Sequence, residues 1–279
     1  CTQPYKTSNP DFLSFYKQSH SLFCYVPYAF WISYFPWGYD QLLQNICWKL
    51  FYPTELHRKT GQALALNKGK NIYITGYPLA DAFLFTPIKK SSWPHDSSKT
   101  KKIIWAPHHS VSPNKYTAHS SFLQYANQMV RLAQENIDRV TIAFKPHPIL
   151  KQNLYLHPEW GPEKTDYYFS LWDSMPNTFI ADGDYIDLFK MSDALIHDCG
   201  SFSAEYLYTK NPCLFIGQER DDILCDFGKL AMEAHYTDKE YSPEQFLQSV
   251  VFEGNDPKHQ TRIHFFNQYL IPPNNKSTS

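Results

Sequence analysis

The chain has 279 residues, of which 43% are hydrophobic and 17% aromatic, enough for one large or two modest domains with a substantial core. Its 26 Lys and Arg residues balance 27 Asp and Glu residues, which leaves a formal net charge of −1. A chain without a global basic field has no general attraction for nucleic acid or for an anionic membrane. Any recognition of phosphate must therefore be local.

The six cysteines lie far apart and form no Cys-X-X-Cys pair, so we interpret them as reduced thiols of a cytoplasmic protein. No run of about 18 uninterrupted apolar residues exists that could span a bilayer. The aromatic stretch 23–37 is broken by prolines and lacks the basic start of a signal peptide. Since the chain begins at Cys1 without a Met, we expect a longer parent protein.

The N-terminal part predicts alternating strands and helices. Residues 21–26 form a short apolar run typical of a buried strand, and apolar residues at helical spacing predict a helix over 42–50. Thr54 then opens a second helix, which we expect to run to about residue 67 and to stop at Lys68-Gly69. Residues 71–75 predict another strand.

The stretch 86–102 is rich in proline, serine and lysine and lacks apolar periodicity, which indicates a linker with a domain boundary near residue 95. We therefore expect the remainder of an N-terminal domain on the acceptor side over 1–95. A nucleotide-binding domain follows over 96–271, and residues 272–279 form a disordered tail.

Beyond residue 100 the pattern becomes regular. Strands are predicted over 103–106, 141–144, 179–180, 194–197 and 213–216. Helices are predicted from Ser121, over 185–191 and 203–208, and in the C-terminal segments 243–252 and 259–270, with Ser121 and Gln124 as a capping box. Continuously apolar strands that alternate with helices indicate a parallel sheet covered on both faces, so the fold class is α/β and doubly wound.

Three unusually polar loops each follow a strand of this half directly. They are Pro107–Ser110, Lys145–Pro148 and His197–Ser201. Because ligands of open parallel sheets bind at the carboxyl ends of the strands, we expect these loops to converge on one site.

The third loop has the composition of a phosphate site that leads into a helix. Gly200 allows close approach of the backbone, and the hydroxyls of Ser201 and Ser203 can donate to phosphate oxygens. Glu205 can accept hydrogen bonds from ribose hydroxyls. The alternative is structural, with a serine as helix cap and Glu205 as a favourable first-turn residue.

The second loop places Lys145 at a strand end as a point charge for phosphate. Two prolines fix the backbone around His147, whose ring can donate a proton or a hydrogen bond to a leaving phosphate. A lone histidine in such a place is more often structural. Its pairing with a lysine and a phosphate-type loop favours the functional interpretation.

His108 and His109 show none of the spacings of known metal sites, so we expect no metal and favour a phosphate or nucleobase contact. Asp182 and Asp184 flank Gly183 and could bind a base edge or ribose, although such a segment is usually a turn. The aromatic stretch from Tyr25 to Trp37 could grip an amphipathic acceptor or a membrane surface, but core packing is the favoured interpretation.

Four segments in this order resemble the CDP-glycerol glycerophosphotransferase family, which includes teichoic acid polymerases and capsule enzymes. They are Trp105–His109, Phe144–Pro148, Tyr185–Phe189, and Ser192–Ser201 followed by Glu205. The resemblance covers residues 70–216 well and 1–70 loosely. It implies a GT-B fold of two facing Rossmann-like domains, of which the N-terminal one would be incomplete here.

The resemblance further implies transfer of a polyol phosphate from a CDP-activated donor to a hydroxyl of a cell-surface glycan or lipid-linked primer. No tightly bound cofactor is implied, and peripheral contact with the inner face of the cell membrane is an option. His147 matches the family's histidine beside the donor pyrophosphate, and Asp198 with Gly200 and Ser201 matches its donor loop. With His147 and His109 as catalytic residues, Lys145, His108, Asp198, Gly200, Ser201, Ser203 and Glu205 form the predicted nucleotide and phosphate site.

Two alternatives remain open. The first is a GT-B glycosyltransferase that uses a CMP- or UDP-sugar, because a phosphate site at a helix end does not distinguish donors. The second is a donor-binding fragment without turnover, since the family's upstream Trp-His-Gly segment, which supplies the proposed base, has no counterpart in this chain.

Overall fold

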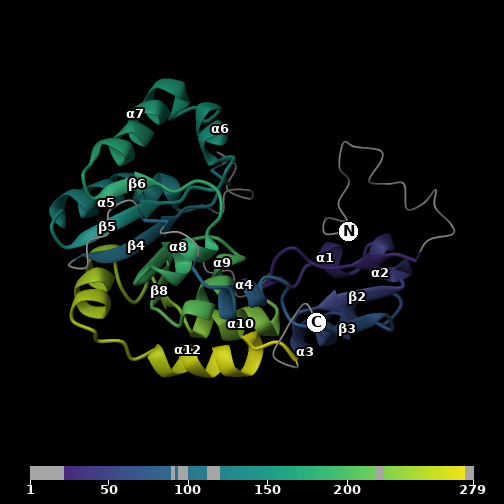
Figure 1. The fold of residues 1–279 in the computed structure, drawn as a ribbon. Coiled ribbons are helices and arrows are strands. Elements are labelled where there is room, and N and C mark those ends of the chain that lie inside the picture. Colours follow the sequence, from purple (N-terminus) through teal and green to yellow (C-terminus); the bar gives the residue numbers. More distant parts are fainter. Residues whose placement is uncertain (1–21, 89–91, 94–99, 112–119, 218–222, 274–279) are drawn as a thin grey trace.

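The computed structural model describes residues 22–88, 92–93, 100–111, 120–217 and 223–273. Two separate parallel sheets organise these residues, one of three strands and one of six. The smaller sheet lies to one side of the larger one (Figure 1). The predicted domain boundary near residue 95 falls between the two sheets in sequence, in a segment outside the described residues.

The smaller sheet has the order β1-β2-β3 and consists of β1 (Cys24–Tyr25), β2 (Lys49–Tyr52) and β3 (Ile72–Ile74). Its helices are α1 (Pro36–Tyr39), α2 (Leu42–Ile46) and α3 (Glu55–Leu64). The predicted helix over 42–50 is wrong in its second half. Leu50 and Tyr52 are buried on one side of β2 with neighbours that are only half-buried, the two-residue period of a strand rather than that of a helix.

Helix α3 begins where the sequence predicts. The Thr54 side chain accepts a hydrogen bond from the backbone N–H of His57, as an N-cap residue should. The helix ends at Leu64, earlier than expected, and the left-handed residues Lys68 and Gly69 then turn the chain into β3.

The larger sheet has the strand order β6-β5-β4-β7-β8-β9, with every pairing parallel. Its strands are β4 (Lys101–Ala106), β5 (Val140–Phe144), β6 (Thr178–Ile180), β7 (Ala194–His197), β8 (Cys213–Phe215) and β9 (Tyr236–Thr237). The chain runs outward from β4 to β6, returns to β7 and continues in the opposite direction. The prediction of a doubly wound parallel sheet is confirmed, and the reversal between β4 and β7 creates the crevice in which such folds bind ligands.

Helices cover both faces of this sheet. One face carries α5 (Phe122–Glu135), α6 (Leu150–Tyr155), α7 (Gly161–Ser174) and α11 (Pro243–Gln245), which continues into the π-helical η4 (Phe246–Phe252). The other carries α4 (Ala80–Leu84), α8 (Ile186–Lys190), α9 (Phe202–Glu205) with the 3₁₀ turn η2 (Tyr206–Thr209), α10 (Asp226–Glu233), and α12 (His259–Phe265) with η5 (Phe266–Leu270). Successive residues of β4 alternate between the two cores, with Trp105 in one and Ala106 in the other. This explains the continuously apolar strands.

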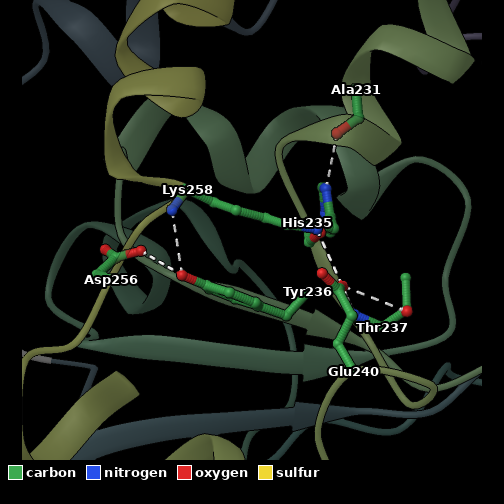
Figure 2. Close-up of polar contacts among 7 residues, drawn as sticks. All are labelled: Ala231, His235, Tyr236, Thr237, Glu240, Asp256 and Lys258. Carbon is green, nitrogen blue, oxygen red and sulfur yellow. Dashed lines mark hydrogen bonds and ion pairs between the residues drawn. The ribbon is translucent and has the colours of Figure 1, made fainter. Parts of the chain in front are cut away.

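The C-terminal segment is tied to the edge strand β9 by a polar network (Figure 2). The Tyr236 hydroxyl donates to Asp256 Oδ1 at 2.8 Å and accepts the backbone N–H of Lys258 at 3.2 Å. From there α12 runs back toward the smaller sheet (Figure 1). A Cβ atom at Gly76 would lie 2.7 Å from Pro272, so the end of this segment closely approaches the turn after β3. The predicted disordered tail lies outside the described residues from 274 onward.

Candidate functional site

A cleft of about 560 Å³ opens at the carboxyl ends of the strands of the larger sheet. The loops after β4, β5, β6 and β7 form one side of it, and residues 28–35, which we call the N-terminal wall, form the other. The three polar loops of the sequence therefore do meet at one edge of the sheet. Among the described residues that line the cleft, none is acidic.

Three imidazoles gather on the sheet side of the cleft. The ring centroids of His108 and His109 lie 4.2 Å apart, and those of His109 and His147 lie 4.3 Å apart. Burial is the main reason that the pKa of His147 falls to about 4, and the neighbouring His109 and Lys145 lower it further. Burial also lowers the pKa of His109. These two rings are therefore neutral near pH 7.

Local hydrogen bonds set which nitrogen of two rings carries the proton. His147 Nδ1 accepts the backbone N–H of Ile149 at 3.3 Å, and His108 Nδ1 accepts that of Ser110 at 3.3 Å. A neutral ring whose Nδ1 accepts must carry its proton on Nε2. The His147 ring thus offers an Nε2–H donor to a ligand. The contact between Asn153 Nδ2 and His109 Nδ1 is longer, 3.4 Å, and fixes this third ring less firmly.

Lys145 brings a cation to the same side. Its ammonium donates to the carbonyl oxygen of Gly183 at 3.1 Å and that of Ala181 at 3.5 Å, and it lies 5.8 Å from the ring centre of Tyr185. Burial lowers the pKa of this lysine, while the nearby Asp182 and Asp184 oppose that effect. The lysine therefore also holds the loop after β6, a role that the sequence did not indicate.

The loop after β7 contributes Cys199, Gly200, Ser201 and Phe202 to the cleft surface. The helix that follows, α9, has only four residues, so its dipole adds little to the binding of an anion. No side-chain cap hydrogen bond forms at Ser201. Gly200 and Ser201 therefore lie where a ligand would touch them, but the short helix α9 contributes little to the binding of its phosphate.

Asp198 does not line the cleft and serves as a structural anchor beneath it. Its Oδ1 accepts the backbone N–H of His108 at 2.5 Å. Its Oδ2 accepts the backbone N–H of Ser121 at 2.6 Å and the hydroxyls of Ser120 and Ser121 at 2.9 and 3.0 Å. The expected capping box at Ser121 is wrong because that hydroxyl is bonded to Asp198. A carboxylate with four internal donors has little capacity left for a nucleotide.

Ser203 and Glu205 are buried behind the loop rather than exposed in the cleft. The Ser203 hydroxyl donates to the carbonyl oxygen of Cys199 at 3.3 Å, and Glu205 Oε1 accepts the hydroxyl of Tyr77 at 2.5 Å. Their direct contact with phosphate or ribose stays a prediction. Of the structural alternative, Glu205 does lie in the first turn of α9, but no serine side chain caps this helix.

The N-terminal wall lies within the aromatic stretch from Tyr25 to Trp37, for which the sequence favoured core packing over a surface that grips an acceptor. Its cleft-lining residues are Tyr28, Ala29, Phe30, Trp31, Ile32, Ser33 and Phe35. Core packing holds for Tyr25 and Phe30, which are buried. The other cleft-lining residues of the wall face the cleft. The wall supplies hydrophobic and hydroxyl groups but no imidazole or carboxylate.

Two general features bear on the kind of ligand. Within the described part of the chain, no group of three or more His, Cys, Asp or Glu side chains is arranged to hold a metal ion. No helix among the described residues is both long and apolar enough to cross a membrane. The cleft thus offers imidazole, ammonium and hydroxyl donors, which suit an anion.

A family model described as CDP-glycerol:poly(glycerophosphate) glycerophosphotransferase matches residues 52–223, well over half of the chain. The match includes the loops after β4, β5, β6 and β7. No curated protein matches the sequence significantly.

Solved structures resemble this fold at low sequence identity. A UDP-GlcNAc 2-epimerase from Neisseria meningitidis bound to UDP-GlcNAc has a TM-score of 0.59 at 15% identity over 92% of this chain and 67% of its own. The wall teichoic acid polymerase TagF has a TM-score of 0.53 at 19% identity, with 80% of this chain and 53% of TagF covered. S. aureus MnaA with UDP has a TM-score of 0.56 at 14% identity, with 89% of this chain and 65% of MnaA covered. The chain thus spans about half to two-thirds of the length of these proteins. The likeness supports the predicted GT-B-like fold.

Proposed function

The chain belongs to the CDP-glycerol:poly(glycerophosphate) glycerophosphotransferase family, and on that basis we propose that its cleft binds a CDP-activated polyol and transfers the polyol phosphate to a hydroxyl. The observation that carries the proposal is the chemistry of the sheet side of the cleft. It combines three imidazoles, one ammonium and one serine hydroxyl, and no acidic side chain is among the described lining residues. Such a surface is suited to a diphosphate.

In the proposed reaction, the acceptor oxygen forms a bond to the β-phosphorus of the donor. The bond from this phosphorus to the oxygen that bridges the two phosphates breaks, and CMP leaves with that oxygen. Phosphoryl transfer needs positioning and charge stabilisation more than covalent chemistry from the protein. Lys145 and the Nε2–H group of His147 supply that stabilisation on the departing phosphate.

His147 acts as a hydrogen-bond donor in this scheme rather than as an acid. With a pKa of about 4, its ring is a neutral imidazole near pH 7 and cannot act as an acid. A bound diphosphate would raise this pKa, because a nearby negative charge favours the imidazolium. The ring can thus strengthen its bond to the phosphate as negative charge builds up on the leaving oxygen.

We assign removal of the acceptor's proton to His109. Burial lowers its pKa, so it is a neutral imidazole near pH 7 with one ring nitrogen able to accept a proton. The N-terminal wall offers no competing imidazole or carboxylate among its residues that line the cleft. The acceptor would therefore approach along that wall, with its hydroxyl toward His109.

The experiment is to measure CMP release from CDP-glycerol by the natural full-length protein with a glycan or lipid-linked acceptor. His147→Ala, which removes the donor, should lower kcat roughly 100-fold, within the range of a lost electrostatic donor. His259→Ala, at a half-exposed histidine on α12, is the matched control and should leave the rate unchanged. An unaltered rate in the His147 variant, with CMP released, would favour a binding site without a catalytic role for this histidine.

A second candidate function is sugar transfer from a UDP- or CMP-sugar in the same cleft. It is favoured by the likeness of the fold to two proteins whose structures contain UDP or UDP-GlcNAc. The phosphate-binding groups described above would serve both donors equally. Release of UDP from UDP-sugars without CMP from CDP-polyols would identify this activity.

We further propose peripheral contact with a membrane through the smaller sheet, as a lipid-linked acceptor would require. Leu42, Ile46, Trp48 and Tyr73 are about half exposed there. The Lys49 ammonium lies 4.5 Å from the ring centre of Trp48 and 4.7 Å from that of Tyr73, a combination found in interfacial surfaces. Flotation with anionic vesicles tests this proposal, and Trp48→Ser should reduce the bound fraction.

A further inference from the structure

Tyr77 joins the two sides of the cleft through a single hydroxyl group. It lies in the turn after β3, and its Oη is 2.5 Å from Glu205 Oε1 and 3.3 Å from the backbone carbonyl oxygen of Tyr28. Glu205 belongs to α9, four residues after the cleft residue Ser201, whereas Tyr28 belongs to the N-terminal wall. The hydroxyl thus connects the loop after β7 to the opposite wall.

A phenol has only one proton, but the Tyr77 hydroxyl faces both the Glu205 carboxyl and the Tyr28 carbonyl, and the Tyr185 hydroxyl interacts with both Tyr77 and Glu205. If Glu205 is ionised, the Tyr77 proton goes to the carboxylate and the Tyr28 carbonyl loses this donor. If Glu205 is protonated, it can donate to Tyr77 Oη, and Tyr77 can then donate to the Tyr28 carbonyl. Only the protonated carboxyl therefore gives a continuous chain from α9 through Tyr77 to the wall.

Glu205 is placed so that both protonation states are accessible near neutral pH. Its side chain is 1% exposed, and burial raises its pKa to about 7, although the hydroxyls of Tyr77 and Tyr185 lower it in part. The other titratable groups that interact with it are the Tyr208 hydroxyl and the Cys199 thiol. No cation is among the groups that shift its pKa.

The wall that Tyr77 contacts is also anchored at other points, among them an antiparallel bridge between Ser33 and Leu224. Phe30 packs on the Tyr77 ring with centroids 4.1 Å apart. The Trp31 carbonyl is 3.1 Å from His57 Nε2, and the Ile32 carbonyl accepts the backbone N–H of Cys225 at 2.9 Å. The Tyr77 to Tyr28 bond is thus the contact that holds the N-terminal end of the wall, whereas the others hold residues 30–33.

We propose that Tyr77 is a positioning residue that transmits the protonation state of Glu205 to the N-terminal wall and so adjusts the closure of the cleft. With Glu205 protonated, the complete chain holds Tyr28 and the wall closed over the ligand. With Glu205 ionised, the wall is held less firmly and ligand affinity falls. The effect on the wall needs no ligand, and only the choice of CDP as a probe rests on the proposed function.

The first test is hydrogen–deuterium exchange of residues 28–35 between pH 6 and 8.5, with each rate divided by that of Glu205→Gln at the same pH. Glutamine mimics the protonated acid because its amide N–H can donate to Tyr77. The division cancels the intrinsic pH dependence of exchange. We expect a ratio near one at pH 6 that rises roughly two- to tenfold by pH 8.5, the effect of losing one hydrogen bond.

In Tyr77→Phe, residues 28–35 should exchange faster than in Glu205→Gln at every pH, because the phenol that contacts Tyr28 is absent. Tyr168→Phe is the matched control, because this buried hydroxyl also donates to a carbonyl, that of Ala126 at 2.9 Å, in the other core. It should leave the exchange of 28–35 as in the wild type. A ratio of wild type to Glu205→Gln that does not change with pH would overturn the proposal, and thermal unfolding confirms that each variant is folded.

The second test repeats the comparison with the affinity for CDP, measured by calorimetry. The dissociation constant of the wild type should match that of Glu205→Gln at pH 6 and exceed it roughly two- to tenfold at pH 8.5. If CDP binds and this ratio stays constant, the coupling to the ligand is refuted. If CDP does not bind at any pH, the proposed function fails, and the exchange experiment alone decides the role of Tyr77.

Discussion

Asp198 holds together three parts of the chain that meet beneath the cleft. Its carboxylate accepts two backbone N–H groups and two hydroxyls, from the loop after β4 and from the start of α5, while it stands at the end of β7. Burial raises the pKa of this carboxyl, and the four donors oppose that effect. The position of His108 in the cleft therefore depends on a residue that does not itself reach the cleft.

Asp198→Asn should destabilise the protein by about 2–4 kcal/mol, because an amide nitrogen replaces one acceptor and leaves buried donors unpaired. Urea unfolding measures this loss as a lower midpoint. Asp173→Asn, at an exposed position of α7, should change stability by no more than about 0.5 kcal/mol. Equal stability of both variants would show that the Asp198 network contributes little.

The residue types of the site could be predicted from the sequence, but several roles could not. His108, His109, Lys145 and His147 follow strands, and parallel order alone brings such loops together. The hydrogen-bond partners of Asp198 are 77 to 90 positions away in sequence, and Tyr77 is 128 positions from Glu205, so these contacts depend on how the elements pack. No local pattern contains that information.

At the scale of elements, α10 and the N-terminal wall are in direct backbone contact. Ser33 pairs antiparallel with Leu224, and a Cβ atom placed on Gly228 would lie 2.0 Å from the Ile32 carbonyl oxygen. The sequence could not decide between core packing and a binding surface for this wall, since the position of the wall is set by the distant segment 223–228.

The predicted helix over 42–50 was wrong for a similar reason. Its last two residues begin β2, the central strand of the smaller sheet, and the pairing of that strand overrides a local helical spacing.

Gly228→Ala tests the contact of α10 with the wall. Alanine favours a helix over glycine by about 1 kcal/mol, but a carbon cannot lie 2.0 Å from an oxygen, so the wall must move. We expect a net destabilisation of about 1–3 kcal/mol in urea unfolding, together with weaker binding of CDP. Lys229→Ala, at the exposed neighbour, is the control. A more stable Gly228 variant would mean that the wall is not held against α10.

At the scale of the whole molecule, the strand order places the site. Because the chain reverses between β4 and β7, the loops after these two strands diverge and leave a crevice that the loop after β5 borders. The smaller sheet contributes the opposite wall through residues 28–35 and Tyr77. The cationic and imidazole groups thus come from one sheet and the hydrophobic wall from the other.

The central claim is transfer from a CDP-polyol, and the most direct measurement is the nucleotide released by the natural full-length protein when CDP-glycerol, other CDP-polyols and UDP-sugars are offered with the same acceptor. We expect CMP in proportion to the polyol phosphate gained by the acceptor, and no UDP. Release of UDP with sugar transfer, and no CMP from any CDP-polyol, would contradict the claim.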